Sequence, residues 1–395
     1  MGEIIKMGES IWQLNRALAG IKPSGIRKYF DLVEKNGGII SLGIGEPDFV
    51  TPQAIRDAGI DSLQKGKTKY TPNAGLTELR VEISRYLERR FDLSYSYEDQ
   101  ILVTVGGSEA IDLCIRATLN PGDEVLIPEP SFVCYGPLAA LSGGVPKPIV
   151  TTVEDRFRLT PEALRKAITP KTKMLVLPYP CNPTGGILER QDLEALAEVL
   201  KDTSIVVLSD EIYAELTYGV THASIAQVPS MHERALLIGG FSKPYAMTGW
   251  RMGYACGAPS IIAAMTKIHQ FGIMSAPTTG QYAAIVAMRD GGHDVDSMHD
   301  EYDKRRRFVV EQFNRMGLSC FEPQGAFYAF PDIRSTKLTS EEFCDKLLYE
   351  YNVAVIPGNA FGACGEGFIR CCYASTMEKL EMAMQRIDAM LQNLR

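Results

Sequence analysis

The sequence predicts an α/β protein in which a mostly parallel sheet, covered by helices on both faces, is joined to a smaller α+β domain. Between residues 101 and 256, short apolar runs alternate with helical segments, and several runs end in glycine or polar residues. After Pro277 these glycine-rich strand endings stop. The length of 395 residues also exceeds the ~250–300 at which one core stops growing. We therefore expect an N-terminal arm with part of the small domain at 1–45, a large ligand-binding domain at 46–285 and a small C-terminal domain at 286–395.

The segment before the first strand is expected to form helices separated by turn-rich loops. An amphipathic helix is expected around Gly25–Lys35, and glycine and proline punctuate Ser41–Val50 as in a loop. Apolar residues at helical spacing predict a helix over Pro52–Lys65. A second turn-rich loop, Lys69–Gly75, precedes a strong helix at Leu76–Phe91.

Seven apolar runs predict the strands of the sheet, and a helix is expected at Glu109–Thr118 after the first. The runs are Ile101–Val105, Glu124–Ile127, Val145–Val153, Met174–Leu177, Ile205–Leu208, Ala235–Ile238 and Met252–Cys256. Ligands of open α/β sheets bind at the carboxyl ends of the strands. The residues that follow five of these strands should therefore share one site: Gly106, Gly107, Ser108, Phe132, Asn182, Asp210, Tyr213 and Lys243.

The C-terminal part is expected to alternate helices with short strands. Helices are predicted through Ile285 and Met288 and at Met298–Met316, Ser340–Tyr351 and Met377–Leu394. Strand-like runs are Ala326–Phe330, Val353–Ile356 and Gly367–Tyr373.

Composition and charge exclude several classes of function. A formal net charge of −7 argues against a general binder of nucleic acid or acidic membranes. The nine cysteines are scattered and the five histidines dispersed, with no C-x-x-C or H-E-x-x-H, so no metal site is expected. No apolar run approaches the ~18 residues of a membrane span. We expect a soluble cytoplasmic protein.

Lys243 has the setting of an amine nucleophile. It follows the apolar run Ala235–Ile238 and two glycines, where a buried strand ends in a loop. Burial disfavours the charged form of a lysine, and the free amine can attack an aldehyde. Arg251, eight positions on, could reach the same small anionic ligand. The alternative is a solvated loop lysine.

Two further groups suit a phosphorylated ligand. Gly106, Gly107 and Ser108 offer backbone N–H groups at a positive helix end, which suits a phosphate, although a plain tight turn is the alternative. Arg251 would supply the counter-charge, or else form a structural salt bridge. Asp210 follows four aliphatic residues, so its carboxylate needs a cationic partner unless it caps a helix or pairs with an arginine.

The remaining candidates are weaker when taken singly. Phe132 and Tyr213 could simply be packing residues, and Asn182 could mark a turn. Arg370 leaves an apolar stretch and requires a carboxylate from the protein or from a substrate. Taken together, the candidates match the groups that would bind pyridoxal 5′-phosphate. They are a phosphate cradle, an aromatic plate, a buried acid, a phenol, an amide and a nucleophilic lysine.

The sequence resembles the fold-type I PLP-dependent aminotransferases of class I/II, most closely the subgroup with bacterial aspartate and aromatic aminotransferases. The resemblance covers nearly the whole chain. It rests on SLGIGEPDF (Ser41–Phe49), KYTPNAGLTELR (Lys69–Arg80), VGGSEA (Val105–Ala110), NPTGG (Asn182–Gly186), SDEIYAEL (Ser209–Leu216), FSKPYAMTGWRMGYACG (Phe241–Gly257) and FIRCCYA (Phe368–Ala374).

The resemblance implies a role for each candidate residue. Lys243 would be the Schiff-base lysine and Asp210 the partner of the pyridine nitrogen. Asn182 and Tyr213 would bind the phenolic oxygen, and Phe132 would stack on the ring. The phosphate would meet Gly106–Ser108, Arg251 and a Tyr70 that reaches across from a second subunit of a homodimer. Arg370 would bind the substrate α-carboxylate, helped by the backbone around Gly45 and by Asn182.

The implied reaction is a ping-pong transfer of an amino group from an L-amino acid to a 2-oxo acid such as 2-oxoglutarate. Many relatives carry tryptophan where Phe132 stands, and some that use acidic substrates carry lysine where Ser108 stands. The second departure favours an aromatic, neutral or broad range of donors. The alternative within PLP chemistry is a C–S β-lyase. Two other classes are disfavoured. A PLP-binding regulator usually carries a separate DNA-binding module, and no basic helix-turn-helix segment precedes residue 40. An NAD-type oxidoreductase would carry a G-x-G-x-x-G fingerprint, which this sequence lacks.

Overall fold

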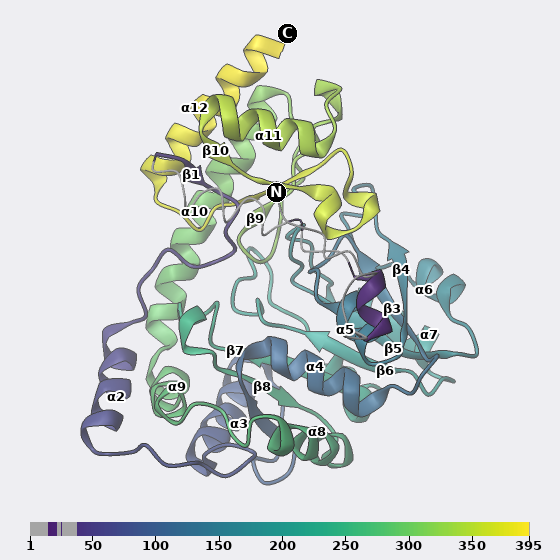
Figure 1. The fold of residues 1–395 in the computed structure, drawn as a ribbon, viewed down its shortest axis with the longest axis vertical. Coiled ribbons are helices and arrows are strands. Elements are labelled where there is room, and N and C mark those ends of the chain that lie inside the picture. The colour runs from purple at the N-terminus through teal and green to yellow at the C-terminus, as the bar shows by residue number, and fades with distance from the viewer. Residues whose placement is uncertain (1–14, 22–24, 26–37, 395) are drawn as a thin grey trace, which may run out of the picture.

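A seven-stranded sheet forms the centre of the protein (Figure 1). The structure is a computed structural model that describes residues 15–21, 25 and 38–394, so most of the helix expected at Gly25–Lys35 lies outside the described residues. The strand order is β2-β8-β7-β6-β5-β3-β4, and β8 alone runs antiparallel to its neighbours. The mostly parallel α/β sheet is thus confirmed. Its strands are β2 (Ile101–Thr104), β3 (Glu124–Glu129), β4 (Val145–Val150), β5 (Thr172–Leu177), β6 (Val206–Asp210), β7 (Ala235–Gly240) and β8 (Gly253–Cys256).

Side chains alternate along the strands and supply two separate cores, one on each face of the sheet. Along β5, Leu175 and Leu177 point into one core, while Met174 and Val176 point into the other. Both faces are therefore apolar, which explains the continuous apolar runs in the sequence. The helices of this part are α2 (Gln53–Gln64), α3 (Thr77–Phe91), α4 (Gly106–Thr118), α5 (Tyr135–Leu141), α6 (Pro161–Ala167), α7 (Arg190–Leu200), α8 (Pro259–Gly272) and α9 (Thr278–Asp290).

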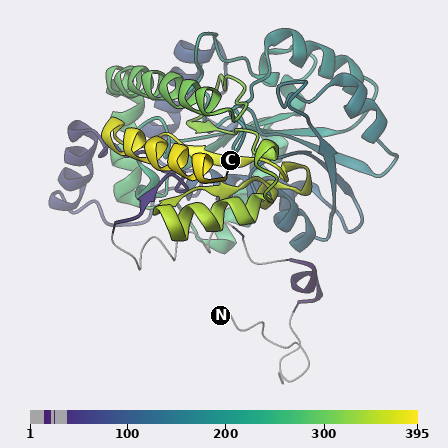
Figure 2. The same ribbon diagram turned by 90° about the horizontal axis from the view of Figure 1, so that it is seen from above.

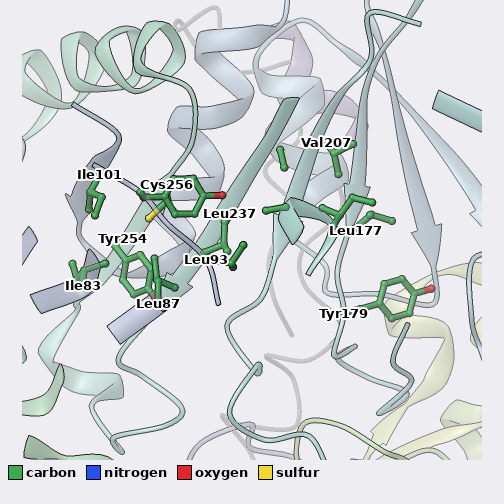
Figure 3. Close-up of a cluster of buried hydrophobic side chains, with 14 of the residues drawn as sticks. Ile83, Leu87, Leu93, Ile101, Leu177, Tyr179, Val207, Leu237, Tyr254 and Cys256 are labelled. Atoms are coloured by element: carbon green, nitrogen blue, oxygen red, sulfur yellow. The ribbon is translucent and has the colours of Figure 1, made fainter. Parts of the chain in front are cut away.

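Each core has its own set of covering helices. The larger one packs α3, α6, α7 and α9 on the sheet, and Figure 3 shows Leu177, Val207 and Leu237 of adjacent strands in the same cluster as Ile83 and Leu87 of α3. The other core packs α4, α5 and α8 against the opposite face. This second face carries the helix that begins directly after β2, which brings the start of α4 to the edge where the parallel strands end.

A second group of elements follows α9 and lies at one end of the molecule (Figures 1 and 2). The short strand β1 (Ile40–Ser41) joins it by pairing with β10, so a segment from near the N-terminus packs among C-terminal elements. The members are α10 (Gly292–Met316), β9 (Tyr328–Ala329), α11 (Ser340–Tyr351), β10 (Val353–Ala354), β11 (Ile356–Pro357), β12 (Ile369–Cys372) and α12 (Met377–Leu394).

Several elements differ from the expectation. Helix α4 begins at Gly106, not at residue 109, because a glycine adopts the positive φ of 72° that lets the helix follow the strand at once. The run Val353–Ile356 is split, since β10 pairs with β1 whereas β11 pairs with β12. The run Ala326–Phe330 contributes only the two residues of β9, which pair with β12.

Within the described residues, no helix combines the length and the apolar character that crossing a membrane requires.

Replacing Gly253 in β8 by alanine should disturb the start of α4. A Cβ at this position would lie 2.5 Å from the backbone N of Gly107 and 2.9 Å from Cα of Gly106, and backbone cannot rotate aside as a side chain can. We expect Gly253→Ala to lower the free energy of unfolding by about 1–3 kcal/mol, as overpacking does. Denaturant unfolding measures the change.

Gly249→Ala is the matched control, because a Cβ at Gly249 meets nothing within 4 Å. Equal stability of the two variants would contradict the close approach of β8 to α4.

Candidate active site

A cavity of about 280 Å³ lies where the parallel strands end. It collects residues that follow five different strands, and residues from β12 and the N-terminal loop complete it. Ten of the twelve predicted site residues line it: Gly45, Gly107, Ser108, Phe132, Asn182, Asp210, Tyr213, Lys243, Arg251 and Arg370.

The other two predicted residues are placed differently. Gly106 lies behind the cavity wall, against the guanidinium of Arg251. Tyr70 does not line the cavity of its own chain, and 82% of it is exposed.

Lys243 extends from the end of β7 into the cavity. Its Nζ donates to the carbonyl oxygen of Gly45 at 2.7 Å and lies 5.9 Å from the ring of Tyr213 and 5.8 Å from that of Phe327. No carboxylate of the described residues forms an ion pair with it. Burial disfavours the ammonium form and lowers the pKa of Lys243 to about 8. A lysine with this pKa is partly a free amine near neutral pH, as a nucleophile toward an aldehyde must be.

Asp210 is the last residue of β6 and is only 7% exposed. Its Oδ2 accepts a hydrogen bond from the Tyr135 hydroxyl at 2.7 Å, and its Oδ1 accepts one from the Ile212 N–H at 3.3 Å. Burial raises the pKa of this carboxyl group. The expected cationic partner is not found, since no lysine, arginine or histidine in the described part of the chain pairs with Asp210, nor does it cap a helix. A buried carboxylate without a cation suits a cationic group on a ligand.

The start of α4 and Arg251 together present unpaired donors to the cavity. The backbone N–H groups of Gly107 and Ser108 reach no acceptor within the described ranges, and both residues line the cavity. The Arg251 Nη1 donates to the Thr248 carbonyl at 2.9 Å, and no described carboxylate pairs with the guanidinium. A Cβ on Gly106 would lie 2.7 Å from the Arg251 Nη2, so a larger residue there would displace the guanidinium. Free helix N–H groups beside an unpaired arginine suit a phosphate.

Arg370 in β12 is a second buried cation without an acidic partner. It is 2% exposed, its Nη1 donates to Asn182 Oδ1 at 2.8 Å, and another nitrogen donates to the Gly43 carbonyl. Its Nε has no hydrogen-bond partner, and the guanidinium lies over the rings of Tyr328 and Phe361 at 4.5 and 4.8 Å. Among the described residues no carboxylate forms an ion pair with it. The charge is therefore available to a carboxylate from a ligand.

Aromatic residues form the remaining walls. The Tyr213 and Tyr328 hydroxyls are 2.7 Å apart, and burial raises the pKa of Tyr213 well above its ordinary value. The ring of Phe132 meets Tyr135 edge to face at 6.2 Å. Both Tyr213 and Phe132 line the cavity, so the interpretation that they serve only as packing residues loses support.

Eight of the eighteen lining residues were not among the sequence-predicted candidates, and three of them, Tyr135, Tyr328 and Thr248, carry hydroxyl groups that make hydrogen bonds beside the predicted residues. Tyr135 lies three positions after Phe132, and a helical turn there would have placed both on one side. Thr248 belongs to the stretch between Lys243 and Arg251. Tyr328 carries no local signal, because it approaches the cavity only through the pairing of β9 with β12.

The cavity fits pyridoxal 5′-phosphate. A buried carboxylate without a cation faces the same space as three cations without carboxylates, Lys243, Arg251 and Arg370. The cofactor and an amino acid substrate together carry the complementary groups, namely an aldehyde, a ring nitrogen, a phosphate and an α-carboxylate.

Comparison with known proteins gives a consistent result. The model of the family "Aminotransferase class I and II" matches residues 37–387. A Bacillus subtilis (strain 168) protein whose name gives the class aminotransferase without an amino donor is 51% identical over 372 residues, 94% of this chain and 96% of that protein. An aspartate aminotransferase of Pyrococcus abyssi is 44% identical over 374 residues, with 94% and 96% covered. The structure of an aromatic aminotransferase from Pyrococcus horikoshii superposes with a TM-score of 0.89 at 43% identity, covering 92% of this chain and 99% of that one.

The lowered pKa of Lys243 predicts how capture of an aldehyde depends on pH. The amine reacts only when it is deprotonated, so the rate should rise with pH and level off above about pH 8. An ordinary lysine would keep gaining reactivity up to its pKa of ~10.4. Mixing pyridoxal with cofactor-free protein and following absorbance measures the profile, without a titrating phosphate.

Lys243→Ala protein is the blank for this measurement. A rate that still climbs beyond pH 9.5 would contradict the lowered pKa.

Proposed function

Because the chain belongs to the class I and II aminotransferases, which use pyridoxal 5′-phosphate, we propose that it transfers the amino group of an aromatic or neutral L-amino acid, or of a broad range of donors, to 2-oxoglutarate. The mechanism would be ping-pong, with the donor product leaving before the 2-oxo acid enters. The observation that carries the proposal is the buried Asp210 opposite Lys243, in one cavity with two unpaired arginines.

The residues of the cavity would hold the cofactor by complementary charge. The free N–H groups of Gly107 and Ser108, with Arg251, would bind its phosphate, and Phe132 would lie against its ring. Tyr213 and Asn182 would donate to its phenolic oxygen. When bound, the cofactor supplies an electrophilic aldehyde and a ring that withdraws electrons from the substrate Cα.

Two residues would control the proton on the ring nitrogen and the proton on the substrate Cα. Asp210 would accept a hydrogen bond from the ring nitrogen and so keep the proton on it, and this role needs an ionised carboxylate. Its burial raises the pKa in the absence of a cation, and a cationic ring nitrogen would oppose that effect. Lys243, once displaced by the incoming amine, would take the proton from the substrate Cα and return it at the neighbouring carbon. Its pKa of about 8 suits both directions near neutral pH.

Arg370 would bind the α-carboxylate of the substrate. Its Nε lacks a partner and its Nη1 donates to the neutral Asn182, so a carboxylate would find an unpaired guanidinium. Gly45 lies at the same wall, where a Cβ would collide with the hydroxyl end of Tyr328. The glycine thus leaves room for the Tyr328 hydroxyl at this wall.

The remaining lining supports an uncharged donor side chain. The three cations of the cavity are each assigned to the cofactor or to the α-carboxylate, and Ser108 supplies no fourth. Apart from Ser242 and Thr248, the lining residues not assigned above are apolar or aromatic, including Ile111 and Tyr135. The second carboxylate of 2-oxoglutarate would then need groups from a second subunit.

We also propose a homodimer in the cytoplasm in which Tyr70 reaches the phosphate of the neighbouring subunit. Tyr70 and Phe271 are 82% and 83% exposed, which is unusual for aromatic side chains that face only water. The Asn73 Nδ2 donates to the Met274 carbonyl at 2.7 Å, so the segments that carry the two rings are joined.

A panel of amino donors tests the reaction. With 2-oxoglutarate as acceptor, we expect phenylalanine, tyrosine, leucine or methionine to give a kcat/KM about tenfold or more above that of aspartate, because no fourth cation meets a distal carboxylate. Glutamate release is the readout. Lys243→Ala should lower the rate by about 10³-fold or more.

Two results would contradict the proposal. Preference for aspartate would overturn the donor class. Pyruvate and ammonia from cystathionine, with no glutamate formed from 2-oxoglutarate, would indicate a C–S β-lyase instead.

Replacing Arg370 by glutamine should affect substrate binding and leave the cofactor in place. Loss of one partner of a buried charged pair costs roughly 3–5 kcal/mol, so KM for the amino donor should rise by about two to four orders of magnitude. Steady-state kinetics and the cofactor absorbance measure the two effects separately. Arg370→Lys, which keeps the charge without the planar fork, should fall between the variant and the wild type. Loss of cofactor with an unchanged KM would assign Arg370 to the cofactor instead.

A further inference from the structure

We propose that His269 and Glu109 act together as positioning residues for the cofactor phosphate, by holding a carboxylate away from the free N–H groups at the start of α4. This inference rests on the proposed phosphate site at Gly107, Ser108 and Arg251. It concerns two residues that do not line the cavity.

Glu109 brings a negative charge into the first turn of the helix that would bind the phosphate. An anion there is attracted by the same unpaired N–H groups and the same helix dipole that would attract the ligand. A phosphate and a free carboxylate at one helix end would therefore compete for donors and repel each other. The conformation of Glu109 decides whether that competition takes place.

In the structure both oxygens of Glu109 are engaged by groups of residues that do not line the cavity. Its Oε2 accepts a hydrogen bond from the backbone N–H of Val105 at 2.5 Å, and its Oε1 lies 2.8 Å from the His269 Nδ1. A carboxylate can only accept, so the Nδ1 of His269 carries the proton and donates it. Val105 is the N-cap of α4 and has no side-chain cap of its own, so Glu109 also satisfies a backbone donor of the turn.

His269 makes no other side-chain hydrogen bond with the described residues. It lies in the last turn of α8, its side chain is 0% exposed, and its Nε2 has no partner. A polar ring in an apolar core is costly unless it is hydrogen-bonded, so the bond to Glu109 is the one polar interaction that offsets burial of this ring. The pair joins α4 to α8, which pack together on one face of the sheet.

The test compares ligands with and without the phosphate. Dissociation constants of pyridoxal 5′-phosphate and of pyridoxal are measured on the full-length, cofactor-free protein by quenching of its intrinsic fluorescence. His269→Leu removes the donor, and the smaller His269→Asn keeps a side-chain N–H near the position of Nδ1. For His269→Leu we expect about tenfold weaker binding of pyridoxal 5′-phosphate, as for a buried acceptor that loses its donor. Pyridoxal binding should change less than twofold, and His269→Asn should bind both ligands within about threefold of wild type.

Glu109→Gln provides a rescue that a purely structural role would not give. Combined with His269→Leu, it removes the freed charge, and we expect affinity for pyridoxal 5′-phosphate to return to within about threefold of wild type. Equal losses for both ligands, or no rescue, would overturn the proposal in favour of a packing role. If His269→Leu does not fold, as judged by its thermal transition, His269→Met fills the space without a donor and takes its place.

Arg251→Leu distinguishes a failure of this inference from a failure of the proposed phosphate site. If Arg251→Leu does not weaken pyridoxal 5′-phosphate selectively over pyridoxal, the phosphate site itself is wrong. If Arg251→Leu is selective and His269→Leu is not, only the role of His269 and Glu109 fails.

Discussion

The site depends on charged groups that have no partner of opposite charge in the described part of the chain, of which Asp210 and Arg370 are buried and Arg251 is exposed. Asp210 has no cation within the described residues, and Lys243, Arg251 and Arg370 have no carboxylate, although all four line one cavity. An isolated buried charge destabilises the folded chain, so such groups persist only where a ligand completes them. The opposite charges do not neutralise one another because each is fixed on a different strand or loop. The fold thus keeps these charged groups apart. The cofactor and its substrate together carry groups of opposite charge that could pair with them.

The sheet explains how these groups can be held apart. Asp210 ends β6 and Lys243 follows β7, and these two parallel strands are adjacent, so their carboxyl ends open on the same side. Arg251 adopts a positive φ of 56° in the loop that turns back into antiparallel β8, and its guanidinium lies over Gly106. The reversal of β8 therefore brings the arginine to the start of α4. A fully parallel arrangement would have needed a crossover helix there and a longer loop.

Much of this could be predicted from the sequence because the signals are local. Apolar runs that end in glycine or a charged residue predicted the strands and the shared edge, and with it the group around Asp210 and Lys243. Contacts between segments distant in the chain carry no such signal. The pairing of β12 with β9, which brings Tyr328 into the cavity, depends on residues about 43 positions apart in register. The Tyr135 hydroxyl was missed as the partner of Asp210 for the same reason, and a cation was expected in its place.

Hydrogen bonds join the C-terminal elements to the loops of the large sheet at the cavity, and a bound substrate would compete for the same donors. Arg370 donates to Asn182 beyond β5, and Tyr328 meets Tyr213 beyond β6, so the walls contributed by the two parts of the chain are joined at the groups assigned to ligand binding. A carboxylate arriving at Arg370 offers a charged acceptor that can take two parallel hydrogen bonds from the guanidinium, whereas Asn182 offers a single neutral oxygen. It would therefore displace the amide oxygen of Asn182 and release that side chain for the cofactor. Because the guanidinium that links the walls is also the one proposed to bind the α-carboxylate, binding of that carboxylate would be coupled to how those walls are held together.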